Sequence, residues 1–312
     1  MQSMKQYAIA IHGGAGTLVK GTMTEAQEAM YKAALQEALM AGYTFLEKGG
    51  SALDAVEAAV KQLEDAPLFN AGKGAVFTAE GTHEMDAAIM EGEHRKAGAV
   101  SLVSGIRNPI ALARDVMEKS NHVFLAGAGA MAFARSLQYP LEDEAYFYNE
   151  LRYRQWQEIR ETDQFQLDHT SSKDRKFGTV GAVACDALGN LAAATSTGGM
   201  TNKKWGRVGD SPLIGAGTYA SNATCAVSCT GSGEYFIRGV AAYDVACLIE
   251  YKGYSLEAAA SEVIHRRMVA LGGDGGLIAI DNKGNIAMPF NTEGMYRARR
   301  NAAGENEISI YG

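Results

Sequence analysis

The chain has 312 residues, of which 47% are hydrophobic and 21% charged, values that are ordinary for a globular protein with a large core. Its net charge of −7, with no extended basic patch, argues against a nucleic-acid-binding protein. No run approaches the ~18 apolar residues of a membrane span, and no apolar signal core follows Met1. We therefore expect no nucleic-acid or membrane partner and a cytoplasmic location.

The first half of the chain alternates between strand and helix patterns. A buried strand is predicted at 6–12 and a long helix at 24–47. Ser51 is expected to cap a second helix, which ends before Pro67. The next predicted elements are strands at 84–90 and 97–103, a helix at 109–119, a strand at 122–126, and helices at 128–138 and 146–160.

Residues 161–177 are polar and nearly free of aliphatic side chains, which is typical of a linker. Hairpins and helix pairs follow, a pattern that favours an α+β fold of antiparallel sheets covered by helices. The basic stretch at 297–300 is interpreted as a solvated strand end. The elements predicted after the linker are strands at 179–186, 190–196, 213–219 and 223–229, helices at 233–250 and 255–270, and closing strands at 276–281 and 285–289.

The four cysteines are expected to be buried, reduced thiols. None lies in a C-x-x-C pair, whereas a zinc site usually needs tight pairs with histidine. Cys225 and Cys229 fall on one face of an apolar strand. We therefore expect no metal cofactor for catalysis.

The stretch KFGTVGAVACDALGNLAAATSTGG at 176–199 raises the possibility of a threonine nucleophile. Taken alone, Thr179 could simply be a β-former at the start of a strand. If the Gly178–Thr179 bond were cut, however, Thr179 would carry a hydroxyl beside its own α-amine. The reference pKa of that amine is about 7.7–8.0, so it can act as a base near neutral pH.

Several motifs in one order resemble the plant-type asparaginases, also called isoaspartyl peptidases, which are N-terminal-nucleophile hydrolases. They are IHGGAG, LFNAGKGAVFT, RNPI, GTVGAVA with GNLAAATSTGG, GRVGDSP, TGSGE and GGLIAID, and they span almost the whole chain. The resemblance implies a four-layer αββα sandwich in a single domain of residues 1–312. It also implies self-cleavage into an α subunit (1–178, with a mobile linker at about 161–178) and a β subunit (179–312), and a homodimer of αβ units.

The same resemblance assigns the catalytic groups. Gly178–Thr179 would be the cleavage site and Thr179 the nucleophile. Thr197 would hydrogen-bond around the nucleophile, and Thr230 with Gly231 would form the oxyanion hole. Thr195 is interpreted as a strand residue. No histidine is expected to serve as the base, because the nearest one, His169, belongs to the predicted linker.

The resemblance also implies a substrate clamp. Arg207 would bind an α-carboxylate bidentately and Asp210 an α-ammonium, with Gly233 in the turn that contacts the substrate. Only the β-carbonyl of an aspartyl unit would then reach Thr179, which makes L-asparagine and β-aspartyl peptides the expected substrates. Without the resemblance, Arg207 and Asp210 would read as two solvated charges in a loop.

A structural sodium ion is implied as well, held by main-chain carbonyls of the LEDAPLFNAGK segment. The matching positions are Leu63, Glu64, Ala66, Phe69, Ala71 and Lys73. Two departures from the family pattern are Phe177, where many relatives have histidine, and the charged Asp274 in GGDGG.

Three alternatives stay open at this point. One is a nucleotide-binding enzyme, because IHGGAG and LAGAGAMAFAR place glycines near helix or strand ends, although neither matches a phosphate-loop pattern. Another is an uncleaved, non-enzymatic binding protein on the same fold. The third is a glycosylasparaginase-type amidohydrolase.

Overall fold

The computed structural model describes residues 6–161 and 178–312 of the chain. Within these residues eight strands form one sheet, in the order β12-β11-β1-β5-β6-β2-β3-β4, and four form another, in the order β10-β9-β8-β7. The larger sheet consists of β1 (Ala8–Gly16), β2 (Met85–Glu91), β3 (Ala97–Val103), β4 (Phe124–Ala126), β5 (Val180–Cys185), β6 (Leu191–Thr197), β11 (Gly294–Asn301) and β12 (Asn306–Tyr311). The smaller sheet consists of β7 (Thr218–Ala220), β8 (Ala226–Gly231), β9 (Gly275–Ile280) and β10 (Ile286–Ala287).

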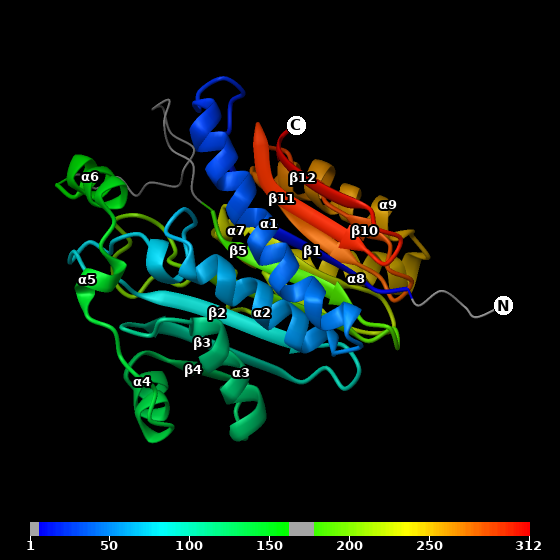
Figure 1. The fold of residues 1–312 in the computed structure, drawn as a ribbon, viewed down its shortest axis with the longest axis horizontal. Helices are drawn as coiled ribbons and strands as arrows, with labels where there is room; N and C mark the ends of the chain where they lie inside the picture. Colours follow the sequence, from blue (N-terminus) through cyan, green and yellow to red (C-terminus); the bar gives the residue numbers. More distant parts are fainter. Residues whose placement is uncertain (1–5, 162–177) are drawn as a thin grey trace.

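The two sheets pack against each other, and helices cover the outer face of each (Figure 1). Strands β1, β5 and β6 contact β8 of the smaller sheet. The larger sheet is covered by α1 (Glu25–Glu47), α2 (Ala52–Asp65) and α3 (Pro109–Lys119), and the smaller by α8 (Ala241–Lys252) and α9 (Leu256–Glu262). The predicted α+β class is confirmed.

The alternation along β1 explains how this strand serves both faces. Ile9 and Ile11 pack in the cluster beneath the helices, whereas Ala8 and Ala10 lie in the cluster between the sheets. Successive side chains of a strand point to opposite faces, and small alanines on the inner face let the sheets approach. This close packing matters for the site, because polar side chains of the two sheets come within hydrogen-bond distance of one another.

Most predicted helices of the first half are confirmed, and their ends follow from capping. Thr24 forms a capping box with Gln27 at the start of α1, and the Ser51 hydroxyl accepts a hydrogen bond from Asp54 N at the start of α2. The helix predicted at 146–160 is instead two helices, α5 (Glu144–Phe147) and α6 (Glu150–Ile159). Asn149 separates them because its side chain caps α6.

The second half departs further from prediction. The helix predicted at 233–250 is broken into α7 (Gly233–Gly239) and α8 by Val240, which has a left-handed φ of 47°. The strand predicted at 213–219 is reduced to β7. The helix predicted at 255–270 continues from α9 through η2 (Val263–Met268) to α10 (Val269–Leu271).

The strands predicted at 276–281 and 285–289 are confirmed as β9 and β10, but the chain does not end with them. The last strands are not β9 and β10 but the hairpin of β11 and β12, which extends the larger sheet beyond β1. The basic stretch 297–300 forms the second half of β11, where its arginines are partly buried. Two of them lie over aromatic rings, with Arg297 4.7 Å from the Phe290 ring centroid and Arg300 4.5 Å from that of Tyr43, whereas Arg299 pairs with Glu307.

Other sequence interpretations can be placed on the fold. IHGGAG lies within β1 rather than in a phosphate loop. Cys185, Cys225 and Cys229 are buried free thiols, whereas Cys247, which was also expected to be buried, is only partly buried. Of the predicted linker, 162–177, including His169 and Phe177, lies outside the described residues. None of the helices described for 6–161 and 178–312 is long and apolar enough to cross a membrane.

Candidate active site

Thr179 lies immediately before β5 and is only 7% exposed. Its hydroxyl lies 3.3 Å from the Ser211 hydroxyl, and its carbonyl lies 2.9 Å from Nδ1 of His12. Both the reactive group and the main chain of the predicted nucleophile are therefore held by neighbours. Ser211 and His12 were not identified by sequence reasoning.

Thr197 lies across from Thr179 at the end of β6. Val180 pairs with Ser196 in the antiparallel β5–β6 ladder, so the next step of this register places Thr179 opposite Thr197. Thr197 is 3% exposed, and in the described part of the chain its hydroxyl accepts a hydrogen bond from Gly199 N (3.0 Å) and makes none with Thr179. The structure thus brings the two threonines together by sheet register.

Thr230 and Gly231 end strand β8 beside Gly178. A Cβ on Gly178 would lie 2.8 Å from the Thr230 hydroxyl oxygen. This oxygen accepts a hydrogen bond from Ala15 N (3.3 Å), so the hydroxyl proton is available to another acceptor. Gly231 has a φ of 153°, and a side chain there would collide with the Asp274 carbonyl. One predicted oxyanion donor, the Thr230 hydroxyl, therefore lies at the predicted cleavage bond, and Gly231 directly follows it in the chain.

Asp274 is not one of these donors, but it holds the turn that follows them in the chain. The Ser232 hydroxyl donates a hydrogen bond to the Asp274 carboxylate, and Ser232 N donates to the Asp274 carbonyl (3.0 Å). The charge that departs from the family pattern is therefore engaged in fixing the loop between β8 and α7.

Arg207 and Asp210 meet at Gly233. A Cβ on Gly233 would lie 2.9 Å from Asp210 Oδ1 and 3.0 Å from Arg207 Nη2. Asp210 is 3% exposed, and its Oδ2 has no partner among the described residues. Burial raises the pKa of Asp210 to about 7, although the Arg207 charge opposes the rise. An unpaired buried carboxylate of this kind suits a cationic ligand.

Glu234 was missed by the sequence analysis, although it ends the TGSGE motif. Its two carboxylate oxygens accept hydrogen bonds from Nε and Nη2 of Arg207, both at 2.9 Å. The guanidinium expected to bind the substrate carboxylate is therefore already paired along one edge. The clamp adjoins the nucleophile because Asp210 directly precedes Ser211, whose hydroxyl contacts Thr179.

Lys203 is a further buried charge next to these residues. It is 1% exposed, and its Nζ donates to the carbonyls of Gly198 (2.9 Å) and Glu84 (2.5 Å). Burial lowers the pKa of its ammonium, while the nearby Asp86 charge raises it. Lys203 thereby fixes the glycine turn that follows Thr197.

The loop predicted to hold sodium fits a hard cation by its donor set. The carbonyls of Leu63, Ala66, Phe69 and Ala71 each accept one main-chain hydrogen bond, at 3.3, 3.4, 3.0 and 3.1 Å, respectively. A carbonyl oxygen has two lone pairs, so each keeps one for a cation. Gly72 packs so closely on the Glu64 carbonyl that a side chain there would collide with it. Because glycine has no Cβ, the two ends of the loop can lie against each other.

Asn70, inside this loop, connects it to the end of β6. Its Nδ2 donates to the Gly199 carbonyl (2.7 Å), and its Oδ1 accepts from Val76 N (3.1 Å). A cation that stiffened the loop would therefore also stiffen the turn after Thr197.

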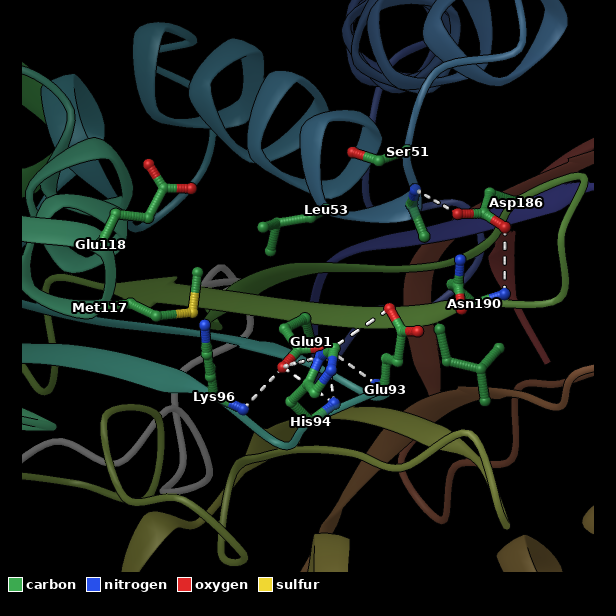
Figure 2. A pocket seen from close by; sticks show the side chains of 12 residues that line it. Ser51, Leu53, Glu91, Glu93, His94, Lys96, Met117, Glu118, Asp186 and Asn190 are labelled. Atoms are coloured by element: carbon green, nitrogen blue, oxygen red, sulfur yellow. Dashed lines mark hydrogen bonds and ion pairs between the residues drawn. The ribbon is translucent and has the colours of Figure 1, made fainter.

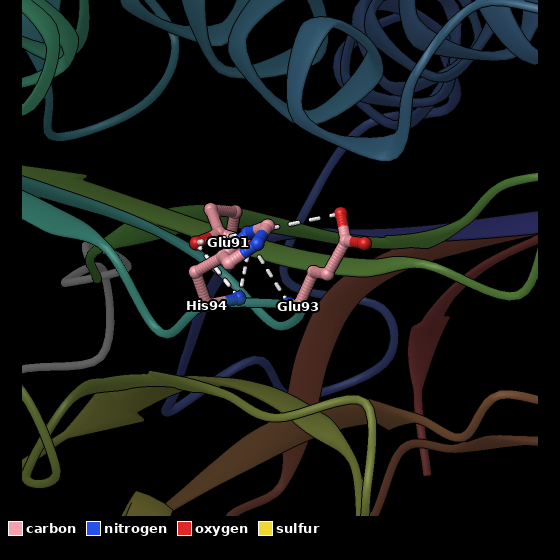
Figure 3. A group of neighbouring side chains, drawn as sticks. All are labelled: Glu91, Glu93 and His94. Carbon is pink, nitrogen blue, oxygen red and sulfur yellow. Dashed lines mark hydrogen bonds and ion pairs between the residues drawn. The ribbon is translucent and has the colours of Figure 1, made fainter.

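A cavity of about 420 Å³ lies elsewhere, between the start of α2, the β2–β3 turn and the β5–β6 turn (Figure 2). Thr179 precedes β5 whereas Asp186 follows it, so the length of the strand, roughly 20 Å, separates the cavity from the nucleophile. Glu91, Glu93 and His94 gather at its edge (Figure 3). The Glu91 carboxylate already accepts hydrogen bonds from three main-chain N–H groups of this turn, which identifies it as a turn cap.

Comparison with known proteins shows which family the chain resembles. A family model described as asparaginase matches residues 5–310. The chain is 53% identical over 311 residues to the isoaspartyl peptidase of Salmonella typhimurium, covering 99% of each chain, and 54% identical over 313 residues to that of Escherichia coli, covering 99% of this chain and 97% of the relative. The plant-type L-asparaginase of Pyrococcus abyssi is 42% identical over 314 residues, with 97% and 99% covered. The chain therefore belongs to the asparaginase family.

Proposed function

We propose that the chain is an isoaspartyl peptidase and L-asparaginase, which hydrolyses the β-aspartyl amide of L-asparagine and the isopeptide bond of β-aspartyl peptides. The observation that carries this proposal is the surroundings of Thr179. Its buried hydroxyl lies beside the Gly178–Thr179 bond, the Thr230 hydroxyl lies against Gly178, and the Arg207–Asp210 clamp adjoins it through Ser211. The names of the relatives support the same substrate class.

Self-cleavage creates the active enzyme. The Thr179 hydroxyl adds to the Gly178 carbonyl, and the oxyanion accepts hydrogen bonds from Thr230 and from Gly231 N. The Gly178–Thr179 C–N bond then breaks, the departing nitrogen takes the hydroxyl proton, and an ester joins Gly178 to the Thr179 oxygen. Water hydrolyses this ester, which leaves residues 1–178 and 179–312 as separate subunits.

The mature site works with the same groups. The free α-amine of Thr179 takes the proton from its own hydroxyl, which attacks the β-carbonyl of the substrate. Arg207 binds the α-carboxylate and Asp210 the α-ammonium, so the β-carbonyl faces Thr179. The ammonium of the amine then protonates the leaving ammonia or peptide amine, and water releases L-aspartate from the acyl-enzyme.

Three further features belong to the proposal. The contacts among helices and sheets support a four-layer αββα sandwich of the N-terminal-nucleophile type in a single domain. Sodium would be held by the 63–73 loop, where it stiffens the main chain around Asn70. The homodimer of αβ units rests on the family resemblance, and a cytoplasmic location stays a prediction.

Mass spectrometry and a substrate panel test the proposal together. Two fragments are expected, the smaller beginning at Thr179, and Thr179→Ala should give one uncleaved and inactive chain. Thr22→Ala, at an exposed position in the loop before α1, is the matched control and should cleave normally. The purified enzyme should hydrolyse L-asparagine and a β-aspartyl dipeptide but not the α-aspartyl isomer. An uncleaved, inactive wild type would indicate a binding protein, and hydrolysis of N-glycosyl-asparagine alone would indicate a glycosylasparaginase.

A further inference from the structure

We propose that His12 is a positioning residue, which holds the main chain of Thr179 and is itself held by a buried chain of hydroxyl groups. The inference rests on the proposed role of Thr179 as nucleophile. The hydroxyl chain consists of Ser228, Thr195 and Thr218.

The two ring nitrogens of His12 have different partners. Nδ1 lies 2.9 Å from the Thr179 carbonyl, and Nε2 lies 2.8 Å from the Ser228 hydroxyl. A carbonyl only accepts, so Nδ1 must carry the proton and donate it. The imidazole is fully buried, and this burial lowers its pKa to about 3, so the ring is neutral. Nε2 is therefore an acceptor, and the Ser228 hydroxyl donates to it.

The directions of the remaining bonds follow from proton count. Ser228 has only one hydroxyl proton and gives it to His12, so in its 2.7 Å bond with Thr195 it must accept. Thr195 therefore donates to Ser228, and its oxygen lies 2.7 Å from the Thr218 hydroxyl, which also lies 3.0 Å from the Ser211 carbonyl. Each of these side chains is 0% exposed. The bonds from Thr195 through Ser228 and His12 all point toward Thr179, an arrangement in which each bond polarises the next.

The chain crosses between the sheets. His12 and Thr195 belong to β1 and β6 of the larger sheet, whereas Ser228 and Thr218 belong to β8 and β7 of the smaller. Through His12, the position of the nucleophile is therefore fixed by both sheets and not by its own strand alone.

Gly181 gives a second, independent indication. It pairs with His12 in the β1–β5 ladder and lies on the strand that Thr179 leads into. A Cβ there would collide with the Ser228 hydroxyl and lie 2.5 Å from His12 Nε2. The φ of Gly181 is not left-handed, so glycine is needed for space. The absent side chain leaves room for the bond between His12 and Ser228.

This anchor matters most after cleavage. Thr179 then begins a chain, and terminal residues fray unless they are tied down. Its amino side has lost the peptide bond to Gly178, and its carbonyl keeps the contact with His12 Nδ1. A nucleophile displaced by about 1 Å can lose about 100-fold in rate. The loss should appear in kcat, because Arg207 and Asp210 still bind the substrate.

Four variants separate positioning from stability. His12→Ala removes the hydrogen bonds to the Thr179 carbonyl and to Ser228. His12→Asn retains an N–H near the place of Nδ1. Ser228→Ala removes only the hydrogen bond that holds the His12 ring. Val183→Ala is the matched control. Val183 is buried between the sheets on β5, the strand that follows Thr179, but it lies outside the hydroxyl chain. Self-cleavage, kcat and KM for a β-aspartyl dipeptide, and Tm are measured, with kcat expressed per mature molecule.

We expect His12→Ala to lower kcat by about 10- to 100-fold with KM within about threefold. His12→Asn should recover part of the lost kcat. The kcat of Ser228→Ala should lie between those of His12→Ala and the wild type. Val183→Ala should lower Tm without lowering kcat. Wild-type kcat in His12→Ala, or no advantage of His12→Asn over it, would overturn the inference. If His12→Ala does not fold, Ser228→Ala decides alone, and wild-type kcat there overturns the inference.

The histidine ¹⁵N spectrum of the wild type gives a readout independent of activity. At pH 7 the His12 ring should be the neutral tautomer protonated at Nδ1, and protonation at Nε2 would overturn the inference. An inactive wild type with the expected tautomer would overturn the proposed function instead. An active wild type with an insensitive His12 would overturn only the inference.

Discussion

Arg207 and Glu234 form a bidentate ion pair, in which Nε and Nη2 of the guanidinium each lie 2.9 Å from a carboxylate oxygen. A substrate α-carboxylate must therefore bind the other edge of the fork or displace Glu234. Glu234 also acts on the second half of the clamp. Burial is the main reason that the pKa of Asp210 is raised to about 7, and the negative charge of Glu234 adds to the rise.

Glu234→Gln should therefore lower KM for β-aspartyl substrates. The variant removes a charge that competes with the substrate carboxylate, and it favours the ionised form of Asp210. We expect an effect of about threefold, the size typical of a partly exposed pair, with kcat little changed. Glu257→Gln, at an exposed position on α9, is the control. A raised KM in Glu234→Gln would instead mean that Glu234 orients Arg207 for binding.

Arg207→Lys should raise KM by about tenfold or more, because a point charge replaces a fork that matches a carboxylate. The loss should be larger for KM than for kcat, since binding precedes the chemistry at Thr179. Steady-state kinetics with L-asparagine measure both. Arg299→Lys, which changes a half-exposed arginine on β11 paired with Glu307, should leave both constants unchanged. Equal kinetics for the two variants would remove Arg207 from the clamp.

Sequence rules predicted correctly those helices whose ends are marked by a capping residue or a proline in the sequence. The helix α3 begins at Pro109 and ends at Lys119 as predicted, because proline suits the first helical turn. The break lies at Val240, which is neither glycine nor proline, although Gly239 ends α7 directly before it. Val240 packs near Gly215, far away in the sequence, so tertiary contact decides its left-handed conformation.

The site shows the same division. Arg207 and Asp210 lie three residues apart in one motif, so the family resemblance could assign them together. His12 and Ser228 are 216 residues apart and meet only because two sheets pack face to face. The sequence analysis therefore did not identify His12 as a neighbour of the nucleophile. That no histidine serves as the base stays a prediction, and burial lowers the pKa of His12 to about 3.

His83 should make the protein less stable in acid. Burial lowers the pKa of this imidazole to about 4, so between that value and its ordinary 6.5 the unfolded chain binds the proton more tightly. The contribution is fully present above pH 6.5 and is lost as pH falls toward 4. The free energy of unfolding should change by up to about 1.4 kcal/mol per pH unit from this residue.

His83→Asn isolates that contribution. Urea unfolding at pH 4.5, 5.5 and 6.5 gives the slope for each protein, and the variant should have the shallower one by about one proton. His122→Asn changes an exposed histidine and should keep the wild-type slope. Parallel slopes for wild type and His83→Asn would contradict the prediction.

The pH dependence of kcat/KM should report two groups of the proposed mechanism at once. The α-amine of Thr179 must be neutral to act as base, and Asp210 must be ionised to bind the substrate ammonium. The amine has a reference pKa of about 7.7, which the positive charge of Arg207 should lower, and the pKa of Asp210 is about 7. Both groups gain a proton as pH falls, so log kcat/KM should fall with a slope approaching two below pH 6.

Asp210→Asn separates the two groups. Its kcat/KM should be lower throughout, because the ammonium loses its counter-charge, but the acidic limb should fall with a slope of one, from the amine alone. His169→Ala should keep the wild-type limb, since the base is not a histidine. A slope of one in the wild type would remove Asp210 from the titration. Loss of the limb in His169→Ala, or a limb only below pH 5, would contradict the free-amine mechanism.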